Sequence, residues 1–161
     1  MHIMIIGGAG MLGRKLAERL AVPGVLAAQP VTELTLVDIV DPVAPSGFTG
    51  TLGLKRANLL DPGVAANLTA QRPDVIVHLA AIVSSEAEAD FDKGYAINLD
   101  GTRSLFDAIR LEGDGYCPRV VFTSSLAVFG APLPDRISDD HIITPLTSYG
   151  TQKAIGELLI S

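Results

Sequence analysis

The chain has 161 residues, of which 48% are hydrophobic and 5% aromatic, and it carries a formal net charge of −6. The acidic balance argues against a broad nucleic-acid-binding surface, and the single cysteine, Cys117, excludes an intramolecular disulfide framework. No basic leader precedes the first apolar run, and no apolar run approaches the ~18 residues of a membrane span. We therefore expect one cytoplasmic domain with no nucleic-acid or membrane partner and no metal site.

Short apolar runs alternate with helical patterns along the chain. Strands are expected at residues 2–6, 34–38, 52–57, 74–79 and 119–123, and helices at 11–21, 63–70, 95–111 and 148–160, the last beginning at a serine cap. The stretches 22–32, 41–50 and 130–145 are rich in proline and are interpreted as connections. Strands that alternate with helices predict parallel pairing and right-handed crossovers. The expected fold is α/β, a doubly wound Rossmann-type parallel sheet of strand order 3-2-1-4-5 with helices on both faces.

A glycine-rich turn, Gly7-Gly8-Ala9-Gly10-Met11-Leu12-Gly13, joins the first expected strand to the first helix. At a helix N-terminus, bare backbone N–H groups bind a pyrophosphate, and a Cβ atom in the turn would keep the phosphate away. A glycine pattern alone can equally mark a tight turn. Its position between a strand and a helix favours dinucleotide binding here.

Asp38 stands at the end of the second expected strand, 25 residues after Gly13. A carboxylate at this place accepts both hydrogens of an adenosine ribose diol and repels a 2′-phosphate, so it predicts NAD rather than NADP. The alternative is an aspartate that only begins the turn before Pro42. At the end of the fourth strand, the small residues Ala80 and Ala81 would let a cofactor lie across the strand tip, and His78 is interpreted as a core residue.

Hydroxyl and amine groups follow the last strand. Ser124 and Ser125 lie directly after it, and taken alone a serine pair there is more often a turn or a helix cap. Tyr149 and Lys153 are four residues apart near the start of the last expected helix, a spacing that puts both on one face. A fixed cation favours the phenolate of a neighbouring tyrosine, which suits it to general acid and base chemistry.

Together these features resemble the extended branch of the short-chain dehydrogenase/reductase superfamily, over all 161 residues. The resemblance rests on the glycines of a GxxGxxG turn, on His78-Leu79-Ala80-Ala81, and on Asn98 with Gly101-Thr102. It also rests on Ser124 to Gly130, which matches the serine motif, and on Ser148-Tyr149-Gly150-Thr151-Gln152-Lys153, which matches YxxxK with Glu157 following.

The resemblance implies an NAD-dependent oxidoreductase. Tyr149 would exchange a proton with a substrate hydroxyl, Ser125 would bind the same oxygen, and Lys153 would hold the nicotinamide ribose. Asn98 would support the proton path or the helix geometry. The residues implied in cofactor binding are Gly7, Gly10, Met11, Leu12, Gly13, Asp38, Asn58, Leu59, Leu79, Ala80, Ala81, Asn98, Tyr149 and Lys153.

Within the branch, Val128-Phe129-Gly130 with Pro132 and Pro134, and the residues around YxxxK, resemble dehydrogenases of a four-carbon sugar acid. Nucleotide-sugar epimerases and dehydratases of the branch use the same residues and remain the alternative, although they more often carry tyrosine in place of Phe129. Two further departures are Ile6, where the branch commonly has threonine, and Asn58, where it usually has an aspartate near the adenine. A non-catalytic NAD-sensing module is a third possibility, disfavoured because such modules tend to lack the tyrosine and lysine.

Members of the branch are roughly twice as long as this chain, which stops at Ser161. The resemblance therefore implies that residues 1–161 form the NAD-binding domain, ending at or just after the YxxxK helix, without the later strands and the substrate-binding portion. It also implies a homodimer formed through helices 95–111 and 148–160.

Overall fold

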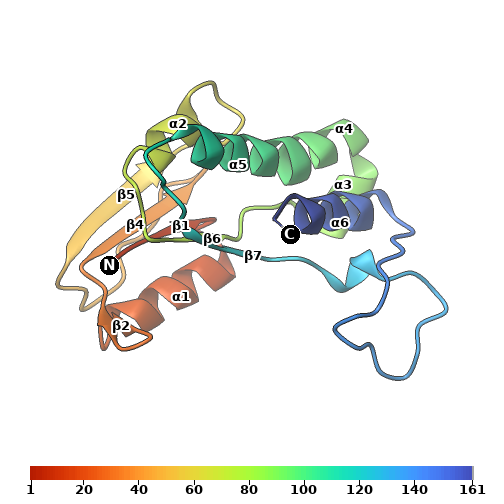
Figure 1. Cartoon of the computed structure of the whole chain (residues 1–161), viewed down its shortest axis with the longest axis horizontal. Coiled ribbons are helices and arrows are strands. Elements are labelled where there is room, and N and C mark those ends of the chain that lie inside the picture. Colours follow the sequence, from red (N-terminus) through yellow and green to blue (C-terminus); the bar gives the residue numbers. More distant parts are fainter. Residues whose placement is uncertain (161) are drawn as a thin grey trace.

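The computed structural model describes residues 1–160 and contains a five-stranded parallel sheet, shown in Figure 1. Its strands are β1 (His2–Ile6), β4 (Glu33–Asp38), β5 (Thr51–Arg56), β6 (Val75–His78) and β7 (Arg119–Phe122). They lie in the order β5-β4-β1-β6-β7, which confirms the predicted order 3-2-1-4-5. Residue 161, the last of the predicted NAD-binding domain, lies outside the described residues.

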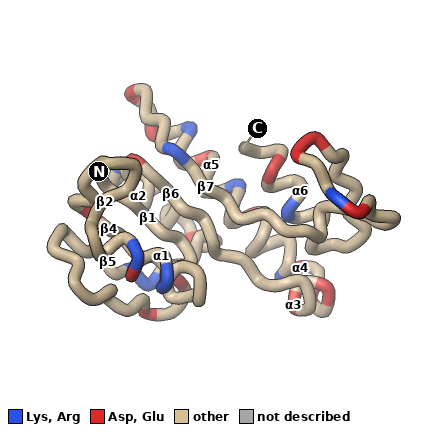
Figure 2. Tube along the Cα trace, turned by 90° about the horizontal axis from the view of Figure 1, so that it is seen from below, with Lys and Arg blue, Asp and Glu red and all other residues tan. Residues whose placement is uncertain are grey.

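Helices cover both faces of the sheet, as predicted (Figure 1). On one face, α1 (Met11–Ala21) packs Ala17 and Leu20 onto Ile3 and Ile5 of β1. On the other, α2 (Val64–Thr69) and α5 (Gly101–Leu111) bring Leu68 and Leu105 against Met4 and Ile6. Because successive side chains of a strand point to opposite faces, the unbroken apolar run of β1 supplies two separate core clusters. Figure 2 shows β1 and β6 free of charged residues.

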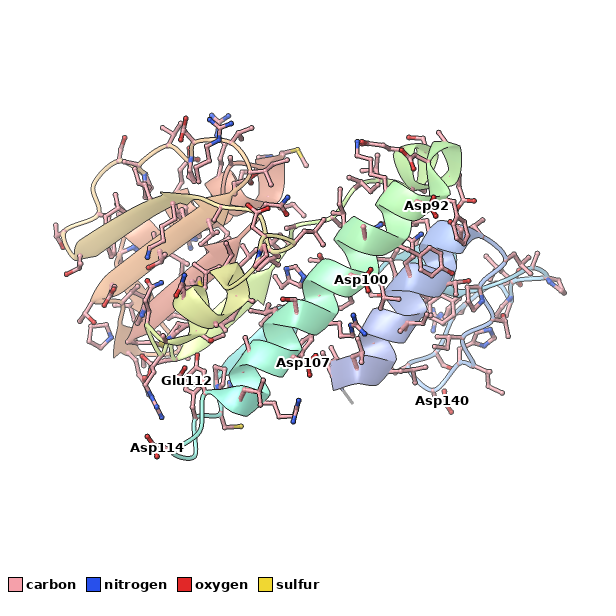
Figure 3. The ribbon with its side chains drawn as sticks, turned by 90° about the horizontal axis from the view of Figure 1, so that it is seen from above. Asp92, Asp100, Asp107, Glu112, Asp114 and Asp140 are labelled. Carbon is pink, nitrogen blue, oxygen red and sulfur yellow. The ribbon has the colours of Figure 1, made fainter. Side chains whose placement is uncertain are left out.

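The last helix, α6 (Ser148–Ile160), lies beside α5, as Figures 1 and 3 show. It packs on α3 (Ser84–Ala89), α4 (Phe91–Gly94), the π-helical turn η1 (Tyr95–Asp100) and the 3₁₀ turn η2 (Leu126–Val128). Its cap is Thr147, whose Oγ1 accepts the N–H of Gly150 at 3.0 Å, so the predicted serine cap at the start of the helix is wrong. Figure 3 labels Asp100, the last residue of η1, and Asp107 in α5.

Three local features were not predicted. Residues 22–32 hold a short hairpin, β2 (Val25–Leu26) and β3 (Gln29–Pro30), rather than a plain connection. The helices α3 and α4 occupy residues for which no element was expected. The helix expected at 95–111 begins earlier, because α4 leads into it without a break from Phe91. Its residues 95–100 form the π-helical turn η1 rather than an α-helix.

The strand register aligns the carboxyl ends of the sheet. Ile6 pairs with Val37 and with His78, and His78 pairs with Phe122. The glycine turn, Asp38, the residues after β6 and the serine pair all follow these ends, so they come to one edge of the sheet. Within residues 1–160, no helix is long and apolar enough to cross a membrane, and no group of three or more metal-ligating side chains forms a metal site.

Candidate active site

A cleft of about 440 Å³ opens at the carboxyl edge of β1, β4 and β6. Eight residues predicted to bind a cofactor line it: Gly7, Gly10, Asp38, Asn58, Leu59, Leu79, Ala80 and Ala81. Sequence reasoning missed a further ten: Ile6, Ala9, Ile39, Val40, Ala57, Leu60, His78, Ile82, Ile97 and Gly101. The missed residues are mostly apolar and lie next to predicted ones in the chain. A rule that extended each strand end by one or two residues would have found most of them.

The glycine turn is built around close backbone contacts. Gly7 has a φ of +94°, and a Cβ there would lie 2.8 Å from the backbone N of Ala80. A Cβ on Gly13 would overlap the carbonyl oxygen of Gly7. At these two positions a side chain is excluded by the protein's own backbone, and not only by the phosphate that the sequence predicts. A Cβ on Gly10 would meet only the Gly7 oxygen, at 3.3 Å, and Gly10 is exposed on the cleft.

Asp38 ties the end of β4 to this turn. Its Oδ2 accepts the backbone N–H of Ala9 at 2.9 Å, and its Oδ1 accepts that of Val40 at 3.4 Å. The N–H groups of Gly7 and Gly8 both donate to the carbonyl oxygen of Val37, which holds the turn from the same strand. A carboxylate at the cleft wall can accept further hydrogen bonds from a ligand hydroxyl, because each oxygen has two lone pairs.

The mouth of the cleft beyond Asp38 is apolar. The exposed side chains of Ile39, Val40 and Leu60 line it. A group of exposed aliphatic side chains in a cleft often marks a binding site. Asn58 lies among them, with its Oδ1 accepting the N–H of Leu60 at 3.1 Å. An aromatic ring system with polar edges, such as a purine, fits between aliphatic walls with an amide at their border.

At the end of β6, His78 is buried, and one of its two ring nitrogens has a hydrogen-bond partner. Thr102 donates its hydroxyl hydrogen to the carbonyl oxygen of Asn98 at 2.8 Å, so the His78 Nε2 at 3.0 Å from Thr102 Oγ1 carries the proton and donates to it. The His78 Nδ1 has no hydrogen-bond partner within residues 1–160. Burial, and secondly the charge of Lys153, lowers the pKa of His78 to about 4. These contacts agree with the structural role predicted for it.

Asn98 lies in η1 and is not part of the cleft lining. Its Oδ1 accepts the N–H of Ile82 at 2.9 Å, and its Nδ2 donates to the carbonyl oxygen of Ile82 at 3.2 Å. The Asn98 amide thus pairs with both backbone groups of Ile82, as the backbone of a neighbouring strand would. Its predicted contact with a cofactor stays a prediction. Met11 and Leu12 are exposed at the start of α1 and also lie outside the cleft lining.

Ser125 follows β7 and begins η2. Its Oγ accepts the N–H of Ala127 at 3.2 Å, so it does act as the cap that a serine after a strand suggests. The hydroxyl hydrogen remains available to donate. The turn packs on α6 through glycine, because a Cβ on Gly150 would overlap the carbonyl oxygen of Ala127. This close packing brings the segment of Ser125 against the helix residue next to Tyr149.

Tyr149 and Lys153 lie in the first two turns of α6, as predicted. The backbone N–H of Tyr149 donates to Oε1 of Glu88 in α3 at 2.7 Å. Lys153 is buried, with its Nζ 4.4 Å from the ring centroid of Phe122 at the end of β7. Burial lowers the pKa of Lys153 to about 8, an effect that Glu157 partly opposes. The Phe122 ring thus holds the Lys153 ammonium in place at the end of the sheet.

The fold therefore forms two neighbouring groups at one edge of the sheet. The cleft has a residue without a side chain at Gly10, a carboxylate at Asp38 and an apolar mouth, which together leave room for the pyrophosphate, ribose and adenine of a dinucleotide. Ser125, Tyr149 and Lys153 do not line the cleft. Ser125 lies after β7, and Tyr149 and Lys153 lie in α6. A hydroxyl, a phenol and an amine at this place can hold and move a proton at a ligand oxygen.

Known proteins provide an independent comparison. The sequence profile of the family described as "NAD dependent epimerase/dehydratase family" matches residues 3–161. D-erythronate dehydrogenase from Cupriavidus necator is 45% identical over 166 aligned positions, which cover 100% of this chain and 50% of that enzyme. D-erythronate dehydrogenase from Haemophilus influenzae is 40% identical, covering 100% of this chain and 49% of that enzyme. The chain thus spans about half the length of these curated relatives.

Two solved structures are similar over nearly the whole chain. The nucleoside-diphosphate-sugar epimerase from Agrobacterium tumefaciens is 64% identical with a TM-score of 0.95, covering 99% of this chain and 47% of that one. UDP-glucose 4-epimerase from Brucella ovis, solved in complex with NAD, is 27% identical with a TM-score of 0.78, covering 98% of this chain and 46% of that one.

Proposed function

The chain belongs to the NAD-dependent epimerase/dehydratase family, and from that premise we propose that it is the NAD-binding part of a dehydrogenase of a small sugar acid such as D-erythronate. The observation that carries the proposal is the 45% identity to D-erythronate dehydrogenase along the entire chain. The activity proposed is that of the whole protein, since the chain covers half of each such relative.

A second candidate function is nucleotide-sugar epimerisation or dehydration, in which the cofactor stays bound and returns its hydride. The observation in its favour is the 64% identity to a protein described as a nucleoside-diphosphate-sugar epimerase. Both reactions oxidise a carbinol with the same groups, so Ser125, Tyr149 and Lys153 do not separate them. The difference lies in whether reduced cofactor is released.

NAD is the cofactor that we propose for the cleft. Gly7, Gly10 and Gly13, with Met11 and Leu12, would surround the pyrophosphate at the N-terminus of α1. Asp38 would accept the hydrogens of the adenosine ribose diol, and its charge disfavours a 2′-phosphate. The adenine would lie near Asn58 and Leu59, and the rest of the cofactor across Leu79, Ala80 and Ala81 and past Asn98, ending near Tyr149 and Lys153. When bound, NAD supplies the hydride acceptor at C4 of its nicotinamide.

The protein's own groups would handle the proton. In the oxidation, the phenolate oxygen of Tyr149 accepts the proton of the substrate hydroxyl, and the Ser125 hydroxyl donates a hydrogen bond to the same substrate oxygen. The ammonium of Lys153 would donate to the nicotinamide ribose. With its pKa lowered to about 8 by burial, Lys153 is still mainly protonated at neutral pH.

Residues 1–161 would form one NAD-binding domain, and we place the protein in the cytoplasm, where its exposed thiol, Cys117, stays reduced. The proposed assembly is a homodimer formed through η1, α5 and α6. Support comes from the side-by-side packing of these helices on one side of the molecule (Figure 3). Sedimentation velocity of the protein measures this assembly directly, and a monomer at micromolar concentration contradicts it.

The experiment that tests the function measures two products from the whole protein. With NAD and D-erythronate, the proposal expects steady formation of free NADH. With a UDP-sugar, it expects neither NADH nor an epimerised sugar. Interconversion of the UDP-sugar without release of NADH would contradict the proposal and support the epimerase alternative.

A further inference from the structure

Gln152 is a buried amide that the proposed reaction does not use. It stands immediately before Lys153 and three residues after Tyr149, and its exposed fraction is 0%. An uncharged polar side chain of this length is costly to bury unless its donor and acceptor are both satisfied. A buried glutamine in the middle of the YxxxK motif therefore calls for a specific set of partners.

Both ends of the amide have partners. The Oε1 of Gln152 accepts a hydrogen bond from Nδ2 of Asn98 at 2.8 Å, in the neighbouring η1 turn. Its Nε2 donates to Oγ of Ser148, one turn earlier in α6, at 3.2 Å. Space for the amide is left by Gly94, where a Cβ would lie 2.7 Å from the Gln152 Nε2. The site is therefore shaped around a primary amide and not merely filled by one.

The network continues to the wall of the cleft. Asn98, which donates to Gln152, also binds the backbone N–H and carbonyl oxygen of Ile82, at 2.9 and 3.2 Å. Ile82 follows Ala81 and lines the cleft. A chain of hydrogen bonds thus runs from the segment after β6, through Asn98 and Gln152, to the first residue of α6.

Gln152 lies close to Tyr149 and Lys153 along α6. Residues three apart on a helix are neighbours on its surface, so the side chain of Gln152 lies on the same side as that of Tyr149. Lys153 is the next residue, so a turn of the helix about its axis moves all three together. The small residues Gly150 and Gly156 pack α6 closely on η2 and Phe122 but provide no directional bond.

We propose that Gln152 is a positioning residue that fixes the rotation of α6, and with it Tyr149 and Lys153, relative to the cleft through its hydrogen bond to Asn98. The proposal rests on the proposed function, because it assigns the two held side chains to the reaction. A purely structural role would only stabilise the fold. A positioning role also sets the surroundings of Lys153 and the rate of the chemical step.

The test compares Gln152→Met with the whole wild-type protein. Methionine has a similar unbranched shape and no amide, so it fills the space and removes both hydrogen bonds. The matched control is Gln71→Met, because Gln71 also donates through Nε2, to the Asn67 carbonyl oxygen, but in an exposed bond just after the end of α2. Gln152→Glu is the second variant, since a buried neutral carboxylic acid again offers one donor and one acceptor.

Two readouts are measured. The first is kcat and KM for D-erythronate with saturating NAD. The second needs no cofactor: the pH titration of the Lys153 side-chain amine, followed by NMR and compared with that of exposed Lys15. In Gln152→Met we expect kcat to fall about tenfold or more with KM changed by less than about threefold. We expect the pKa of Lys153 to rise from about 8 toward 10.5 as the amine gains solvent.

Gln152→Glu is expected to recover most of both readouts, and it carries the test if the methionine variant does not fold. The proposal is overturned if folded Gln152→Met keeps the wild-type kcat or the wild-type Lys153 midpoint, whatever happens to its melting temperature. A wild-type protein that reduces no NAD with a sugar acid would instead refute the proposed function. The titration of Lys153 would then decide the positioning role on its own.

Discussion

Acid should destabilise this protein through one buried histidine, His78. Its pKa is lowered by burial, and further by the charge of Lys153, from 6.5 to about 4. In the unfolded chain the same imidazole titrates at its ordinary value. Between about pH 6.5 and pH 4 the unfolded state therefore binds a proton that the folded state does not. Stability falls as the pH falls through this window and levels off below it.

The size of the effect follows from the two pKa values. Their difference of about 2.5, at 1.36 kcal/mol for each pKa unit, gives about 3 kcal/mol lost between neutral pH and pH 4. A loss of this size is a large fraction of the 5–15 kcal/mol that is typical of small domains. The protein should consequently unfold at much lower urea concentration at pH 4 than at pH 7.

Urea unfolding at several pH values, followed by circular dichroism, measures this loss. The comparison is with His78→Gln, whose amide nitrogen can still donate to Thr102 but does not titrate. Wild type should lose about 3 kcal/mol more than the variant over the same pH range. His2, whose pKa burial also lowers, is present in both proteins, so its contribution cancels. An identical pH dependence in the two proteins would refute the assignment to His78.

Three further predictions concern the site. Asp38→Ala should weaken NAD binding about tenfold or more, because charge-assisted hydrogen bonds contribute about 1.5–3 kcal/mol each; an unchanged Kd by titration calorimetry would remove Asp38 from the ribose site. Tyr149→Phe should abolish turnover while leaving the Kd for NAD nearly unchanged, and loss of NAD binding in the folded variant would argue against its role at the substrate oxygen. Gly13→Ala should cost about 1–3 kcal/mol through overlap with the Gly7 carbonyl oxygen. Its control is Gly113→Ala, which has a φ of +75° but open space and should cost about 1 kcal/mol; a Gly13→Ala stability equal to wild type in urea would contradict the packing argument.

The sheet and its order followed from the sequence because β1 and β6 are short, apolar and separated by helical patterns. Parallel strands buried on both faces leave few other arrangements. The predicted site residues could be assigned to this edge for the same reason, since Asp38 and Ser125 lie at or soon after a strand end and Tyr149 and Lys153 lie in the first two turns of a helix.

The hairpin of β2 and β3 could not be read from the sequence. Its turn residues, Ala27 and Ala28, have φ values of 48° and 63°, a conformation that usually requires asparagine or glycine. Likewise, α3 has the sequence SSEAEA, which lacks a helical apolar period, and only tertiary packing of Ala87 gives it a buried face. Local pattern carries no signal where long-range contacts decide the conformation.

The roles of Asn98 and Gln152 were beyond sequence reasoning for a different reason. Their pairing joins residues 54 apart in the chain, and it depends on a π-helical turn that no local pattern announced. The expectation that Asn98 supports either the proton path or the helix geometry left this choice open. The hydrogen bonds of Asn98 to Ile82 and Gln152 favour helix geometry.

The most direct test of the proposed activity is the formation of NADH by the whole protein from NAD and D-erythronate, followed by the near-ultraviolet absorbance of the reduced cofactor. The account predicts steady, multiple-turnover NADH formation that is lost in Tyr149→Phe. No NADH from D-erythronate, together with epimerisation of a UDP-sugar by the same preparation, would contradict it.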